Sequence, residues 1–105
     1  MNWKTPQKKQ LVKVLLALET PREVECFLRD LMTESEITEF SNRLETASLL
    51  AQNVSYSQIQ KRTGLSATTI ARVSKWLNNG MNGYKRMLNR ISHHAHLSPV
   101  RKGVI

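Results

Sequence analysis

Residues 55–77 read SYSQIQKRTGLSATTIARVSKWL, a stretch that carries the signals of two short helices joined by a tight turn. Ser55, with Gln58 three residues later, forms a capping box that starts the first helix. Gly64 allows the positive φ that ends this helix in a sharp reversal, and Ser66 caps the second helix. Two helices joined in this way are typical of a helix-turn-helix, which places its second helix in the major groove of DNA.

The outer face of the second helix predicts DNA contacts. Thr68, Arg72 and Lys75 share this face at spacings of i, i+4 and i+7. Threonines can bond bases or phosphates, alanines leave room for thymine methyls, and Arg72 is the one evident bidentate reader of guanine. We therefore expect water and DNA shape to supply part of the specificity. The inner contacts are expected from Ile59, Leu65, Ile70, Val73 and Leu77. The predicted DNA-binding residues are Ser57, Gln58, Gln60, Lys61, Ser66, Ala67, Thr68, Thr69, Ala71, Arg72 and Lys75.

The charge distribution also predicts a polyanionic partner. Sixteen Lys and Arg against eight Asp and Glu give a net charge of +8. All acidic residues lie between Glu19 and Glu45, so the chain from Thr46 onward carries only positive charge. Such a half attracts polyanions through counterion release and long-range steering. A solvated basic surface or a membrane surface would also fit the charge, but the helix-turn-helix pattern favours double-stranded DNA.

Length and composition predict one small all-α domain in a reducing compartment. A chain of 105 residues has room for one domain, and its middle lacks proline. Cys26 is the single cysteine, so we expect no intrachain disulfide and a packed thiol. The longest apolar run is residues 14–18, far short of a membrane span, and no signal peptide is evident. The protein is therefore expected to be cytoplasmic.

Four further helices bring the expected total to about six. The first, over residues 6–18, carries an apolar stripe broad enough to require a covering surface. The second starts at Thr20 with a proline and a capping glutamate, and the third, from a Thr33 cap to about Gln52, has an acidic first turn. The last runs from about Gly83 to Ser92. The inward stripe of the third is expected from Ile37, Phe40, Leu44, Ala47 and Ala51.

Residues 1–92 are expected to form the DNA-binding domain and residues 93–105 a mobile basic tail, since periodicity is lost there. Three histidines at the start of this tail, His93, His94 and His96, lack neighbouring carboxylates, so no metal site is predicted. The chain shows no Ser-His-Asp set, paired catalytic carboxylates or phosphate-cradling glycine loop. An enzyme is not expected.

The sequence resembles the tryptophan repressor superfamily, in particular its YerC/YecD-like branch of small bacterial proteins. The resemblance covers about residues 23–88 and is carried by FLRDLMTESEITEFSNRLETASLL, the helix-turn-helix and the following LNNGMNGY. It implies a transcription regulator, in the first instance a repressor, built as an intertwined all-helical homodimer. It also implies a two-fold operator with half-sites about one DNA turn apart.

The resemblance also implies a site for a small-molecule corepressor. Two arginines of the tryptophan repressor sandwich the indole ring and a threonine holds the amino acid; Thr33, Arg43 and Arg72 stand at the matching positions. Val73 replaces a glycine and Trp76 a small serine, and both add bulk where the ligand would lie. We therefore expect the pocket to be filled by the protein's own side chains, with no cofactor. A salt bridge from Arg43 to Glu39 or Glu36 is the competing interpretation.

Two other functions remain open. An RNA-binding protein would use exposed aromatic side chains to stack on bases, and the candidates, Tyr56 and Tyr84, can both be read as packed. A protein-interaction adaptor would use the same helices against a partner protein. Binding to duplex DNA, single-stranded RNA and competitor at several salt concentrations separates the three.

Overall fold

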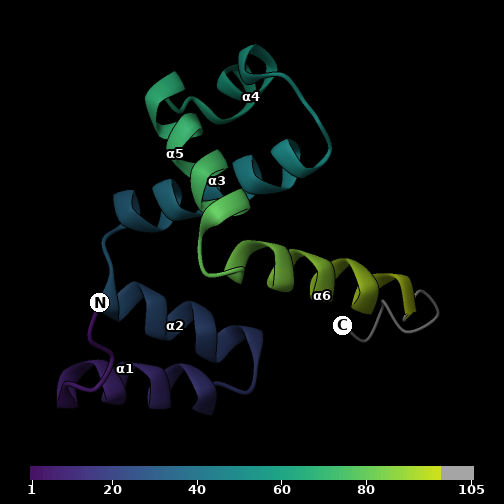
Figure 1. Cartoon of the computed structure of the whole chain (residues 1–105). Helices are drawn as coiled ribbons and strands as arrows, with labels where there is room; N and C mark the ends of the chain where they lie inside the picture. The colour runs from purple at the N-terminus through teal and green to yellow at the C-terminus, as the bar shows by residue number, and fades with distance from the viewer. Residues whose placement is uncertain (98–105) are drawn as a thin grey trace. The chain divides into compact units, whose positions relative to one another are not determined.

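A computed structural model describes the backbone of residues 1–97 and the side chains of residues 1–92. The described chain is all-α, as predicted (Figure 1). Internal contacts divide the chain into two compact units, Met1–Ile37 and Thr38–Ile105, which we call the first and second units. The helices are α1 (Pro6–Ala17), α2 (Pro21–Leu31), α3 (Glu34–Ala51), α4 (Tyr56–Thr63), α5 (Ala67–Asn79) and α6 (Gly83–Leu97).

The first unit owes its two complete helices to threonine caps. The Thr5 hydroxyl accepts the Lys8 N–H at 3.3 Å, and the Thr20 hydroxyl accepts the Glu23 N–H at 3.1 Å. The Glu23 carboxylate accepts the N–H of Glu19 at 2.9 Å, one residue before the N–H that a standard capping box would use. The bounds of α1 lie within a residue of the predicted ones, and α2 starts directly after its predicted Thr20 cap.

The first unit has no buried core of its own. Every side chain of residues 1–37, all of which the structure describes, is at least partly exposed. Leu16 is 81% exposed, and Leu15 and Leu31 are about half exposed. The prediction that Cys26 is a packed thiol is wrong for the single chain, since this residue is exposed. Two short helices offer no third layer that could cover their apolar faces.

The start of α3 is a complete capping box. The Thr33 hydroxyl accepts the Glu36 N–H at 3.1 Å, and the Glu36 carboxylate accepts the Thr33 N–H at 2.9 Å. The predicted inward stripe is only partly right. Of its members Ala47 is buried, whereas Phe40 is 46% exposed and Leu44 is also exposed. The buried residues of α3 lie toward its C-terminus and are Thr46, Ala47 and Leu49.

The second unit has a core made of two adjoining clusters. One joins α3 and α5 through Ala47, Val73 and Leu77, with Tyr84 and Leu88 of α6 packed against it. The other joins α3, α4 and α5 through Leu49, Ile59 and Ile70, with Val54 and Leu65 beside it. Leu50 packs against both clusters. The inner contacts predicted for the helix-turn-helix are therefore confirmed, and they seat α4 and α5 on the C-terminal half of α3.

The last helix is longer than predicted. It continues to Leu97, where the loss of periodicity suggested an end at Ser92. Residues 93–97 contain no helix breaker, and the helix ends shortly before Pro99, since a proline disfavours helical geometry in the residue before it. The backbone of the three histidines is thus helical; their side chains, and the predicted tail beyond Leu97, lie outside the described residues. Across the described chain, no helix combines the length and apolar character needed to cross a membrane.

Candidate nucleic-acid interface

Local hydrogen bonds build the turn between α4 and α5. Gly64 adopts φ 74°, in the left-handed region, and donates its N–H to the Gln60 carbonyl at 2.8 Å. The buried Thr63 hydroxyl donates to the Ile59 carbonyl at 2.8 Å and accepts the Leu65 N–H at 3.2 Å. Sequence reasoning missed Thr63; a lone threonine just before a helix-ending glycine was its only signal. The Ser66 hydroxyl accepts the Thr69 N–H at 3.1 Å and so starts α5 as predicted.

The second helix of the motif has one buried and one exposed face. Ile70 and Val73 have no exposed surface, while Thr68, Arg72 and Lys75 are all exposed. The core therefore fixes the rotation of α5 about its own axis and presents a polar, basic face to solvent. Ala67 and Ala71 are exposed on the same helix, where they leave room for a close approach.

Two predicted contact residues have a structural task as well. Thr69 is half-buried, and its hydroxyl accepts a hydrogen bond of 3.1 Å from the Ser66 hydroxyl. Both side chains thus help to cap α5, which leaves less of their hydrogen-bonding capacity for an outside partner. The backbone N–H groups of the same first turn, next to these caps, are the groups that helices commonly offer to phosphates.

The outer surface of α4 matches its prediction. Its exposed residues include the four predicted contacts, Ser57, Gln58, Gln60 and Lys61, and Gln60 points outward as expected. Arg62, which the sequence did not single out, lies 3.5 Å from the Glu45 carboxylate and so links α4 to α3. The Tyr56 side chain is 40% exposed, so reading it as packed was wrong.

The electrostatics of the second unit favour an anionic partner. In residues 1–92, the four recorded ion pairs use the cations of Arg22, Arg29, Arg43 and Arg62. Lys61, Arg72 and Lys75 take part in none of these pairs. The first turns of α4, α5 and α6 carry no acidic residue, whereas those of α2 and α3 do. The positive ends of the helices that form this unit's surface are therefore uncompensated and attract negative charge.

Arg43, at the position of a corepressor arginine, already has partners. Its Nη2 lies 2.7 Å from the Glu39 carboxylate, which is the salt bridge considered as the competing interpretation. Its guanidinium carbon lies 5.6 Å from the centroid of the Phe40 ring and 5.8 Å from that of the Trp76 ring. Arg72 is exposed. Thr33 belongs to the first unit, where its hydroxyl is bonded to Glu36.

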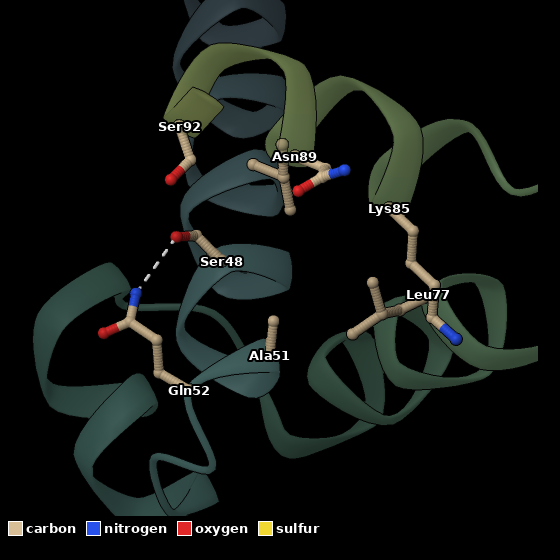
Figure 2. Close-up of a pocket in the computed structure, with 8 residues that line it drawn as sticks. Ser48, Ala51, Gln52, Leu77, Lys85, Asn89 and Ser92 are labelled. Atoms are coloured by element: carbon tan, nitrogen blue, oxygen red, sulfur yellow. Dashed lines mark hydrogen bonds between the residues drawn. The ribbon is translucent and has the colours of Figure 1, made fainter. Parts of the chain in front are cut away.

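The surface of the second unit has hollows on both sides of α6, among them the following. A largely apolar groove of about 630 Å³ is lined by Leu44 of α3, Trp76 of α5 and residues of α6. A smaller hollow of about 280 Å³ lies between α3 and α6, and Figure 2 shows the Gln52 amide turned toward the Ser48 hydroxyl, 3.2 Å away. Among residues with described side chains, no group of three or more His, Cys, Asp or Glu could hold a metal ion.

The chain matches the model of the family described as Trp repressor protein over residues 6–92. It therefore belongs to the Trp repressor family, as the sequence resemblance implied. An uncharacterised protein of Bacillus subtilis (strain 168), YerC, is 38% identical over 82 residues, which cover 78% of this chain and 79% of that protein. This relative agrees with the predicted YerC-like branch.

Solved structures agree with the fold. A TrpR-like protein from Eubacterium eligens matches with a TM-score of 0.83 and 37% identity, over 86% of this chain and 93% of that one. A proposed Trp repressor from Staphylococcus aureus matches with a TM-score of 0.82 and 32% identity, over 88% and 95% of the two chains. The six-helix fold is thus the fold of TrpR-like proteins.

Proposed function

We propose that this protein is a transcription regulator, acting as a repressor, that reads specific duplex DNA with α5. The observation that carries the proposal is the exposed face of Thr68, Arg72 and Lys75 on a helix whose other face is fully buried. Membership of the Trp repressor family supports the same role. In this proposal α5 enters the major groove, while Gln58, Gln60 and Lys61 of α4 contact the flanking backbone. Such a role places the protein in the bacterial cytoplasm.

The working form in this proposal is a homodimer. The first unit exposes Leu15, Leu16 and Leu31, and the second exposes Phe40 and Leu44, apolar side chains that a partner surface could cover. A second copy would cover these faces, so that residues 1–92 act as one intertwined DNA-binding domain. A two-fold dimer then presents two copies of α5 to half-sites about one DNA turn apart.

This regulator would not need tryptophan. The support is Arg43, whose guanidinium is already engaged by Glu39, Phe40 and Trp76. A calorimetric titration with L-tryptophan should show no saturable heat. A saturable heat at micromolar concentration would contradict this part of the proposal and leave the DNA-reading part standing.

Selection of bound duplexes from a random pool, followed by gel shift at several salt concentrations, tests the DNA-reading role. Thr68→Ala and Arg72→Ala should each weaken binding to the selected duplex roughly five- to a hundredfold, the range expected for one good base contact of about 1–3 kcal/mol. Thr38→Ala and Arg22→Ala are matched controls, since both native residues are exposed and belong to α3 and α2, outside the helix-turn-helix. Equal losses in variants and controls would show that α5 is not the reading helix.

The exposure of Tyr56 keeps RNA as the second candidate, because an exposed aromatic ring on a helix that also carries Lys61 and Arg62 can stack on a base. Single-stranded RNA should fail to displace the selected duplex, and Tyr56→Leu should leave duplex affinity within about threefold, since no base stacking is lost. RNA that competes better than the duplex, and loses this advantage in Tyr56→Leu, would replace the proposal with RNA binding.

A further inference from the structure

Four side chains in the second unit form a cluster that the DNA contacts do not account for. Three belong to α3, namely Glu39, Phe40 and Arg43, and the fourth, Trp76, belongs to α5. The Arg43 guanidinium lies within 6 Å of both ring centroids, the range in which a cation is attracted to an aromatic face. The 2.7 Å bond to Glu39, one turn earlier on α3, fixes the direction of the guanidinium. We call this cluster the arginine clamp.

Arg43 is the least exposed member of the arginine clamp, whose other three side chains are about half exposed. The Arg43 side chain is only 28% exposed, and its Nε atom is buried without a hydrogen-bond partner. A cation–π contact is stronger when the cation has lost part of its hydration, because water no longer competes for the charge. Trp76 itself is 43% exposed, so one part of the indole faces outward while another part meets the guanidinium. The contact thus joins α3 to α5 at a place where the buried apolar core does not reach.

The place of Trp76 on α5 connects the clamp to the reading face. Trp76 follows Arg72 by four residues, about one helical turn, and directly follows Lys75. Ile70 and Val73 seat the middle of α5 on the core, while the clamp holds the flank that carries Trp76. Gly80, whose N–H bonds the Trp76 carbonyl at 3.0 Å, ends α5 just beyond, and an added Cβ there would collide with that carbonyl oxygen. Because α5 packs on the core through Ile70 and Val73 and meets Arg43 through Trp76, a rotation or a tilt of α5 would break one of these contacts.

We propose that Trp76 is a positioning residue of the DNA-reading face, which acts through Arg43 to set the orientation of α5 on α3. The clamp is formed within one chain, so the reading geometry is set before DNA arrives and without a small-molecule effector. This inference rests on the proposed DNA-reading function. It assigns Arg43 to the support of the reading helix and not to contact with a ligand or with phosphate.

A double-mutant cycle tests the clamp. Trp76→Ala and Arg43→Ala should each weaken binding to the selected duplex about tenfold, the loss expected from one desolvated cation–π contact. The double variant should have about the same duplex affinity as the single variant that binds less tightly, because both changes remove the same contact. Trp76→Phe keeps a ring over the guanidinium and should restore most of the affinity. Met81→Ala is the matched control, since it shortens an exposed apolar neighbour in the same groove.

The salt dependence distinguishes positioning from direct contact. The slope of log K against log salt is negative, and each lost phosphate contact reduces its magnitude by about 0.9, so a positioning role predicts an unchanged slope in Arg43→Ala. A magnitude smaller by about 0.9 would make Arg43 a phosphate contact and overturn the inference. Additive losses in the cycle, or full affinity in both single variants, would overturn it as well.

Two further measurements test the arginine clamp independently of the proposed DNA-reading function. In a Trp3→Phe background, Trp76 is the only tryptophan, so Arg43→Ala should shift its fluorescence. An unchanged emission would disprove the clamp even if the wild type binds no DNA and the proposed function fails. The oligomeric state is measured for every variant. If Trp76→Ala no longer forms the oligomer of the wild type, Arg43→Ala, which keeps the indole, decides: a larger loss of affinity than in Met81→Ala supports the clamp, and equal affinities contradict it.

Discussion

The two units of the chain begin their helices equally well and differ in what covers them. Thr20 caps α2 and Ser66 caps α5 through the same type of hydrogen bond, each 3.1 Å long. Residues 1–37 nevertheless bury no side chain, whereas Ile59, Ile70 and Val73 of the second unit have no exposed surface. Helix formation is therefore a local property of this sequence, and burial is not.

The comparison also separates two kinds of stability. The second unit has three helices around the C-terminal half of α3, so its motif can be held by its own core. The first unit leaves Leu15, Leu16 and Leu31 to solvent in a single chain. Its stability is expected to come from a partner surface, which the proposed second copy would supply.

Leu16→Glu should have the largest effect, because it places a carboxylate where the proposed dimer buries a leucine. The change should have little effect on the stability of the single chain, in which Leu16 is 81% exposed. The molar mass by light scattering should fall from two chains to one at micromolar concentration. Duplex affinity should fall by about a hundredfold or more as the two linked half-site contacts are lost.

Gln10→Glu is the control for this prediction, because it adds the same charge to an exposed polar position of α1. It should leave mass and affinity unchanged. A Leu16→Glu protein that keeps the wild-type mass would show that α1 is not covered by a second copy.

Ile70→Ala should have the next largest effect and should act on the second unit. Removing a fully buried isoleucine leaves a cavity in the cluster with Leu49 and Ile59, at a cost of about 2–5 kcal/mol in the free energy of unfolding. Urea unfolding followed by circular dichroism measures this loss. Ala71→Ser, at the exposed neighbour, should change stability by less than about 0.5 kcal/mol. Similar values for the two variants would mean that the motif has no rigid core.

Removal of a helix cap should have the smallest effect on stability. The same change can be made in the first and in the second unit, which allows the two units to be compared directly. Thr20→Ala and Ser66→Ala should each lower the free energy of unfolding by about 1 kcal/mol, since each leaves a helix N–H without its acceptor. The glycine variants at the same positions should lose only a few tenths of a kcal/mol. A much larger loss at one position would show that its cap also holds a tertiary or dimer contact.

Much of the fold was predictable because its signals are short-range. The caps at Thr20, Thr33 and Ser66 were read directly, and so was the left-handed turn at Gly64. The family was indicated by the resemblance of about residues 23–88 to the tryptophan repressor superfamily. The candidate DNA contacts, apart from Thr69, are exposed, as their predicted place on the outer faces of the two helices requires. Helical spacing alone shows which residues share a face, so this prediction does not depend on which elements pack nearby.

The failures share a different origin. Periodicity put Phe40 and Leu44 in an inward stripe, but α5 and α6 cover a part of α3 nearer its C-terminus. The expectation that Tyr56 and Cys26 are packed is wrong for the single chain, in which both are exposed. In each case the sequence identified an apolar or adaptable side chain and could not identify the surface that would meet it.

The residues alone were enough to predict about six helices, the caps of four of them and a helix-turn-helix with a polar outer face, because these features depend on bonds spanning two to four positions. Tertiary structure alone decided which part of α3 is covered and that Arg43 meets Trp76, two residues 33 positions apart in the chain. Contacts between distant positions depend on how whole helices are seated on one another, and no local pattern encodes that placement.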